Sequence, residues 1–247
     1  MQIIYILWLR QLKRYLRSRS RLIGSLAQPL FFLVALGFGF GPVFSKAGEG
    51  NYIQFLVPGI MSMTIIFTSI FSGMEIIWDR QFGFLKETLV APVPRLNIMV
   101  GRTLGGATIA TMQGTLVLLL SLIAGFRPVS WGLVPIVILV MYLSSLLFTA
   151  LGTAIASKLD DMQGFQMIMN FLVMPLFFLS GAIFPLDRTS VLGTIASFDP
   201  LSYTVDALRH ILTNIHFFTL AWDISILVIL MALFLAIGSY FFSKVQI

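Results

Sequence analysis

The sequence predicts an all-α membrane protein with six transmembrane helices, an N-terminal amphipathic interfacial helix, and an outer re-entrant helical hairpin between spans five and six. Hydrophobic residues make up 58% of the 247 residues and charged residues only 11%, whereas an average soluble domain is about 25% charged. Six charge-free stretches are long enough to cross the hydrocarbon layer, which takes about 20 residues of helix. These stretches are 22–45, 50–74, 103–126, 128–157, 162–186 and 224–243. None alternates with a period of two, so we expect helices rather than the strands of a barrel.

Residues 1–20 form the first expected element, a helix with two unlike faces. One face is apolar and carries Ile4, Leu7, Trp8, Leu12, Tyr15 and Leu16, and another carries Arg10, Arg14 and Arg17. This pattern is typical of a helix that lies in the membrane interface. The basic region is too broad and the following apolar run too long for a cleaved signal peptide.

The spans are expected at about 22–41, 52–75, 102–124, 128–157, 164–184 and 224–242. Between them, 79–102 is the longest polar segment on the side of the N-terminus, and 158–163 is a short loop on the same side. Gly101 and Gly105 have the spacing that allows close helix packing, most simply within one bundle. With no internal repeat and no linker, we expect one domain over 1–247.

Residues 185–222 are too apolar for an ordinary loop and too charged for two spans. We expect a pair of short helices broken at Asp199 and Pro200, which dip into the outer leaflet or lie on it. Backbone at that depth must be covered by protein. Asp206 and Arg209 lie three residues apart on one helix face, so we expect them to neutralise one another.

The distribution of cationic side chains predicts the orientation. With the N-terminus in the cytoplasm, twelve of the sixteen Lys and Arg residues lie inside, and only Lys46, Arg127, Arg188 and Arg209 lie outside. We therefore expect a multi-pass protein of the cytoplasmic (inner) membrane with both termini in the cytoplasm. Its net charge of +6 then points to anionic lipid headgroups, not to nucleic acid.

Composition also narrows the function. The chain has no cysteine, so thiolate metal sites and catalytic thiols are excluded, and His210 and His216 have no partner cluster for a metal. The spans lack the ionisable groups of a charge-coupled transporter and the constellations of an intramembrane enzyme. A passive channel or a membrane assembly factor without an ATPase partner stays open on composition alone.

Two motifs carry a resemblance to a known family. The first is MPLFFLSGAIFPL at 174–186, followed by DPLSY at 199–203 and DALR at 206–209. The second is DRQFGFLKETLVAPVPR at 79–95, followed by Gly101 and Arg102. Together they resemble ABC transporter permeases of the type-2 exporter family, most closely the drug and nodulation-factor branch. The chain departs from the family pattern at Phe84 and Ala91, where threonine is common.

The resemblance implies two copies of this chain and two copies of a separate ATPase subunit, which binds ATP and magnesium. This chain is then no enzyme by itself and binds no cofactor or metal, in line with its lack of the phosphate-binding G-x-x-x-x-G-K-[ST] motif. The implied substrate is hydrophobic or amphipathic: a drug, a lipid-like molecule or a glycan-like molecule.

The family motifs also imply roles for particular residues. The coupling segment 79–95 would contact the ATPase through apolar anchors and charges, namely Asp79, Arg80, Phe82, Gly83, Phe84, Leu85, Lys86, Glu87, Leu89 and Pro92. The signature residues expected to take part in gating are Pro175, Ser180, Gly181, Pro185, Pro200, Asp206 and Arg209, with Pro175 and Gly181 bending span five. Asn170, Phe177 and Phe178 are expected along the substrate path.

Overall fold

The computed structural model describes residues 2–46, 51–84, 93–185 and 191–244, and the regular structure in these ranges is helical throughout. Its helices are α1 (Gln2–Arg17), α2 (Arg19–Lys46), α3 (Tyr52–Ser72), α4 (Met74–Gln81), α6 (Arg95–Ile123), α7 (Val134–Ala156), α8 (Met162–Leu179), α9 (Val191–Ala196), α10 (Pro200–Thr213) and α11 (Leu220–Ser243), with a short 3₁₀ turn, η1, at Trp131–Leu133. Six segments are long and apolar enough to cross a membrane: Leu22–Phe44, Tyr52–Gln81, Arg95–Ile123, Trp131–Ala156, Met162–Leu179 and Leu220–Ser243. The predicted all-α fold with six helices that can span a membrane is confirmed.

Several helices begin where a side chain caps the first turn. The side chains of Asn51, Asp161 and Asp199 accept hydrogen bonds from the amides of Ile53, Gly164 and Leu201, respectively. These bonds satisfy amides that have no partner within the helix. Pro200 follows at the first position of α10, where its missing N–H costs nothing. The predicted break at Asp199 and Pro200 therefore separates α9 from α10.

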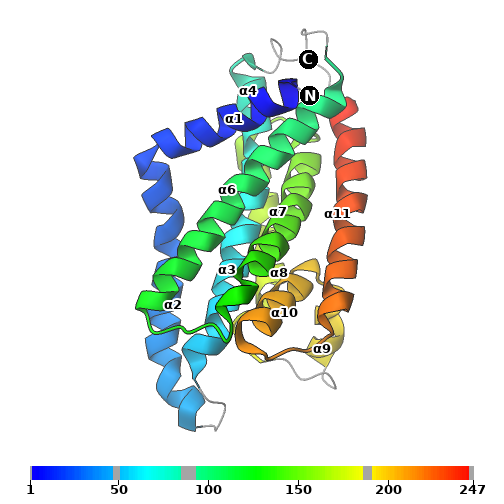
Figure 1. Ribbon diagram of the computed structural model, residues 1–247. Helices are drawn as coiled ribbons and strands as arrows, with labels where there is room; N and C mark the ends of the chain where they lie inside the picture. The colour runs from blue at the N-terminus through cyan, green and yellow to red at the C-terminus, as the bar shows by residue number, and fades with distance from the viewer. Residues whose placement is uncertain (1, 47–50, 85–92, 186–190, 245–247) are drawn as a thin grey trace.

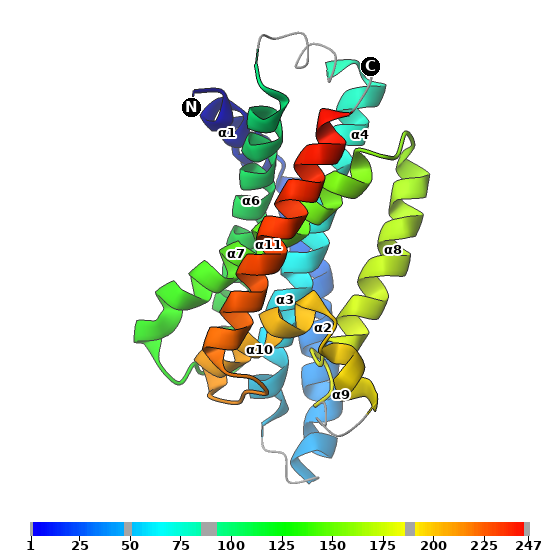
Figure 2. The ribbon, with the colours of Figure 1, turned by 90° about the vertical axis from the view of Figure 1, so that its right-hand side faces the viewer.

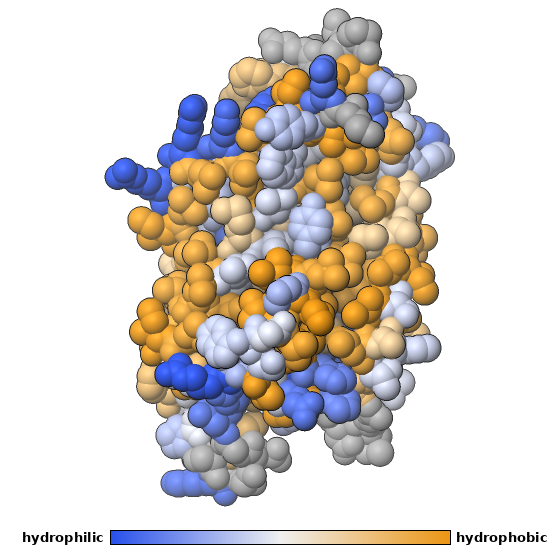
Figure 3. Space-filling view, viewed as in Figure 1, coloured by the Kyte–Doolittle hydropathy of each residue, from blue (hydrophilic) through white to orange (hydrophobic). Residues whose placement is uncertain are grey.

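Helix α3 lies at the centre of the bundle and contacts α2, α6, α7 and α10 (Figures 1 and 2). In its span, 78% of the apolar window is buried, against 17% in α2, 22% in α8 and 11% in α11. Figure 3 shows apolar side chains across the middle of one face and hydrophilic ones toward both ends. The peripheral helices thus present apolar surface to lipid or to another protein chain.

The two ends of the bundle differ. Helices α1 and α4, the start of α6 and the end of α11 lie at one end, and α9 and α10 lie toward the other (Figures 1 and 2). Helix α1 packs across α6, where Trp8 Nε1 donates to Thr108 Oγ1 over 2.9 Å. A Cβ on Gly101 would lie 3.0 Å from the Cβ of Leu7, so the Gly101–Gly105 pair serves packing within the chain.

The crossing of α3–α4 with α7 depends on glycine. A Cβ on Gly152 would lie 2.5 Å from the carbonyl oxygen of Ile70, and a Cβ on Gly73 would lie 2.5 Å from the carbonyl oxygen of Gly152. Both obstacles are backbone atoms, which cannot rotate away. The helices can therefore approach this closely only without side chains at these positions.

Replacing Gly152 with alanine should lower the free energy of unfolding by about 1–3 kcal/mol, because the new methyl group overpacks the crossing. Gly39→Ala is the matched control, since a Cβ at Gly39 in α2 meets no atom within 4 Å, and it should be neutral or stabilise the helix by about 0.5–1 kcal/mol. Thermal unfolding of both variants in detergent measures the difference. Equal shifts in the two variants would refute the close crossing.

Candidate functional site

The end of the bundle that holds α4 contains a buried ionic cluster. Asp79, in the last turn of α4, is only 5% exposed. Its Oδ2 lies 2.5 Å from Nη2 of Arg102 in α6, and its Oδ1 lies 3.6 Å from Nη2 of Arg10 in α1. One carboxylate therefore joins α4 to α1 and α6 at the start of the coupling segment.

Arg80, the next residue, faces the loop between α7 and α8. Its Nη1 donates to the carbonyl oxygen of Leu159 over 3.0 Å, and its Nη2 donates to that of Ser157 over 3.3 Å. It also forms an ion pair with Asp160. The two segments that sequence reasoning placed on the same side of the membrane are thus fastened together.

The chain turns directly after α4. Gly83 has φ +80, a conformation that side chains other than Asn or Asp rarely adopt. Phe82 and Phe84 flank it and are 71% and 52% exposed. The predicted coupling residues Leu85, Lys86, Glu87, Leu89 and Pro92 lie outside the described residues. What is described of the segment is a tight turn that presents two aromatic side chains.

At the opposite end, α8 stops earlier than predicted. The helix ends at Leu179, Ser180 caps it, and Gly181 follows with φ +74. The expected bend of span five at Gly181 is therefore wrong: this glycine lies beyond the helix, in the turn that leads to α9. Pro175 lies inside α8, and Pro185 lines a cavity of about 150 Å³ together with Ser180.

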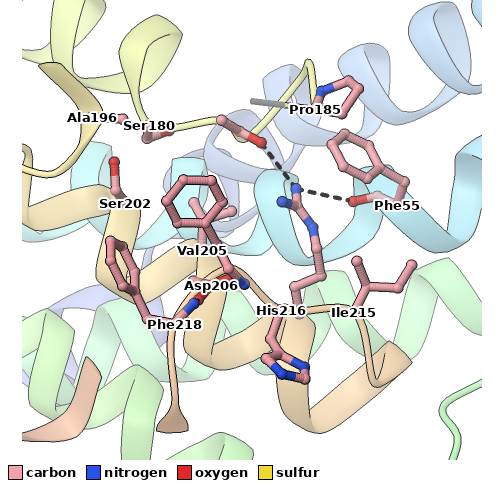
Figure 4. A pocket seen from close by; sticks show the side chains of 13 residues that line it. Phe55, Ser180, Pro185, Ala196, Ser202, Val205, Asp206, Ile215, His216 and Phe218 are labelled. Atoms are coloured by element: carbon pink, nitrogen blue, oxygen red, sulfur yellow. Dashed lines mark hydrogen bonds between the residues drawn. The ribbon is translucent and has the colours of Figure 1, made fainter. Parts of the chain in front are cut away.

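Arg209 of α10 anchors this end of the bundle by two hydrogen bonds, which are the dashed lines in the view of the cavity in Figure 4. Its Nη2 donates to the carbonyl oxygen of Gly181 over 3.0 Å and to that of Phe55 over 3.4 Å. The guanidinium carbon also lies 3.9 Å from the ring centroid of Phe55, a favourable cation–π geometry. Burial lowers the pKa of Arg209 to about 10, so the side chain stays protonated at neutral pH.

Asp206 has other partners than the one predicted. Its two carboxylate oxygens accept hydrogen bonds from the amides of Phe217 and Phe218, over 2.7 and 2.6 Å. The ion pairs among the described residues do not include one between Asp206 and Arg209. The two charges attract one another, since Asp206 opposes the lowering of the Arg209 pKa, but they make no direct contact. Asp206 holds the chain after α10, while Arg209 holds the chain after α8.

The three residues expected along a substrate path divide into two groups. Asn170 and Phe178 of α8 are exposed, whereas Phe177 is buried in the core, with its ring centroid 5.5 Å from that of Phe178.

Sequence reasoning also missed contacts that join distant elements, such as Gln11 Nε2 donating to Glu75 over 3.1 Å and Tyr52 donating to the carbonyl oxygen of Ile183 over 3.1 Å. The only signal for them is a polar side chain on an otherwise apolar face.

Removing the partner of a buried charge should be costly. Arg102→Leu leaves the Asp79 carboxylate with Arg10 alone, at 3.6 Å, and should lower the free energy of unfolding by about 3–5 kcal/mol. The double variant Arg102→Leu with Asp79→Leu should recover much of that loss, because it buries no unpaired charge. Unfolding of the single and double variants gives the coupling energy, and strictly additive losses would contradict the buried pair.

Arg209→Met keeps the length of the side chain and leaves the carbonyls of Gly181 and Phe55 without this donor. An unsatisfied buried acceptor such as the Gly181 carbonyl costs about 1–3 kcal/mol, so the segment that contains α9 and α10 should open more readily. Hydrogen exchange of α10 amides measures this opening. Arg209→Lys keeps the charge but lacks the planar fork, so it should restore only part of the protection. Unchanged exchange in Arg209→Met would show that the anchor is dispensable.

Comparison with known proteins places this arrangement in a family. The profile of the ABC-2 type transporter family matches residues 2–213. The chain is 31% identical to the ycf38 protein of Porphyra purpurea, which is named as a transport permease, over 93% of this chain and 83% of the relative. It is 28% identical to nodulation protein J of Rhizobium leguminosarum bv. trifolii over 84% of this chain and 78% of the relative. The chain therefore belongs to the ABC-2 type transporter family and is a multi-pass membrane permease subunit.

Proposed function

We propose that this permease subunit works in an ATP-driven exporter that moves a hydrophobic or amphipathic substrate, such as a drug, a lipid-like molecule or a glycan-like molecule. The observation that carries the proposal is the exposed turn at Phe82, Gly83 and Phe84, fixed to the bundle through Asp79 and Arg80. Exposed aromatic side chains beside charges are suited to dock into a groove of a partner protein. The family implies an ATPase as that partner.

In the proposed assembly, two copies of this chain join two copies of the ATPase, which hold ATP and magnesium. This chain binds no cofactor of its own. The protein lies in the cytoplasmic membrane with both termini inside, so that α4 faces the ATPase and α1 rests among lipid headgroups. Among the relatives, nodulation proteins and transport permeases recur by name, which favours the branch that exports amphipathic molecules.

The coupling mechanism follows from the contacts of α4. Closure of the ATPases would push on 79–95, and the force would reach α6 and α1 through Asp79 and the α7–α8 loop through Arg80. The substrate path is proposed between the two copies, along α2, α3 and α8. Helices α2 and α8 flank α3 and bury little of their own surface, and α8 exposes Asn170 and Phe178 there.

Gentle purification of the chain from its native membrane tests the assembly. A stoichiometric ATPase subunit, with two copies of each chain by native mass, is the expected result. Recovery of the folded chain without any nucleotide-hydrolysing partner would instead favour a passive channel or a membrane assembly factor.

A charge in the coupling turn should uncouple the complex. Gly83→Asp should cut substrate-stimulated ATP hydrolysis by about tenfold or more, because an unpaired charge buried in an interface costs several kcal/mol. Leu85→Asp should behave alike. Gly83→Asn is the matched control, because asparagine has the same shape and tolerates positive φ, and it should keep most of the activity. If Gly83→Asp hydrolyses ATP as the wild type does while its spans stay folded, the coupling role is refuted.

A further inference from the structure

A second cavity lies on the side of the bundle opposite the outer hairpin, where α1 turns into α2. It has a volume of about 330 Å³ and is lined by residues of α1, α2, α3, α4 and α6. Small-molecule sites in proteins typically occupy about 300–1,000 Å³. The cavity is formed by one copy of the chain and shares no lining residue with the cavity beside Arg209.

One side of the cavity is apolar. Phe67 and Phe71 stack with ring centroids 6.3 Å apart and planes 6° from parallel. Ile109 of α6 and Met74 of α4 are further apolar residues of the lining. Such a surface accepts an acyl chain or a flat ring.

The rest of the lining is largely polar, and hydrogen bonds fix the position of part of it. Gln113 is 1% exposed, and its Nε2 donates to the hydroxyls of Tyr15 and Ser25 over 2.7 Å each. Its Oε1 accepts from the hydroxyl of Thr68. A buried amide within a membrane span is costly unless it is bonded. This network therefore places a cluster of hydroxyl groups at the cavity wall.

Gln28 of α2 completes the polar side. It lines the cavity six residues into the first span, about 9 Å along the helix from the span's start. Its exposed amide makes no hydrogen bond to other parts of the chain that the structure describes. An amide at such a depth in hydrocarbon needs a partner, and a polar group of a bound molecule would supply one.

We propose that this cavity binds an amphiphile whose uncharged head both donates and accepts hydrogen bonds, as hydroxyl and amide groups do. Its head meets Gln28 and the hydroxyls around Gln113, and its apolar tail lies against Phe67 and Phe71. Glu75 is the one charged side chain among the described lining residues, and its carboxylate accepts from Gln11. Arg14 lies near Trp78, with its guanidinium carbon 5.7 Å from the ring centroid, but it does not line the cavity. Among the lining residues the charge is therefore negative, which disfavours an anionic head. A resident lipid and a transported molecule share this chemistry.

Trp78 lines the cavity and reports on its occupancy. In the full chain with Trp8, Trp131 and Trp222 changed to phenylalanine, Trp78 is the remaining tryptophan. The chain is placed in lipid nanodiscs and titrated with a dibrominated stearoyl monoglyceride, whose bromines quench tryptophan on contact. We expect quenching that saturates at a low mole fraction. Dibrominated stearate, with the same tail and an anionic head, should give only the linear quenching of a bulk lipid.

Matched variants locate the site. Gly24→Phe should abolish the saturable component, because Gly24 lines the cavity and a Cβ there meets no atom within 4 Å. Gly39→Phe, on the same helix with the same free space but away from the cavity, should keep it. Gln28→Leu should weaken binding by about two- to tenfold, as expected for one lost hydrogen bond, whereas Gln166→Leu on α8 should not.

Three results would overturn the proposal: quenching that never saturates, saturation that survives in Gly24→Phe, or equal quenching by the monoglyceride and the stearate. A further titration with the co-purified ATPase and a non-hydrolysable ATP analogue separates the two sources. A transported molecule should lose affinity when the analogue binds, and a resident lipid should not. Binding by the chain alone is independent of the exporter proposal, so failure of one leaves the other distinguishable.

Discussion

The carboxylate of Asp79 is the contact on which one end of the molecule depends. It receives Arg102 from α6 and Arg10 from α1, and α4 continues α3 in the most buried of the six possible membrane spans. A buried ion pair adds little net stability over an apolar contact, because desolvation offsets the attraction. The ion pair instead determines how the helices are placed, because the three helices can meet here only in the register that brings these charges together. Helix α1 is thereby attached to the core of the bundle.

At the opposite end of the bundle, a buried charge is stabilised by neutral groups instead of by an ion pair. Arg209 has no carboxylate within ion-pairing distance among the described residues, and it satisfies two carbonyl groups and one aromatic ring. The carbonyl of Gly181 lies in the turn after α8, outside the hydrogen-bond pattern of a helix, so it needs another donor. Asp206 does the converse for two amides after α10. The charged side chains of this otherwise apolar segment thus form hydrogen bonds with backbone groups that lie outside helices.

Most of the fold could be predicted, because a charge-free stretch of sufficient length leaves the chain few alternatives to a membrane helix. The residues at which the spans end were harder to predict. Span two continues to Gln81, past two acidic residues, because Asp79 finds Arg102 at a distance of 23 positions that no local pattern reveals. Span five ends at Leu179 because Gly181 adopts a left-handed turn. The spacing of Asp206 and Arg209 predicted a pair, yet backbone groups from other segments compete for both side chains, and these groups leave no trace in the sequence.

Helix α4 connects the coupling turn to the second cavity. Glu75 and Trp78 line the cavity and lie on α4, the helix that also carries Asp79 and Arg80. Tyr15 closes the cavity from α1, which Arg10 attaches to the same helix. A displacement of α4 by the proposed ATPase would therefore move two sides of the cavity together against α2 and α6. Occupancy of the cavity and the position of the coupling turn are then linked for any ligand that prefers one position of α4, since such a ligand must shift that helix's equilibrium by the same free energy.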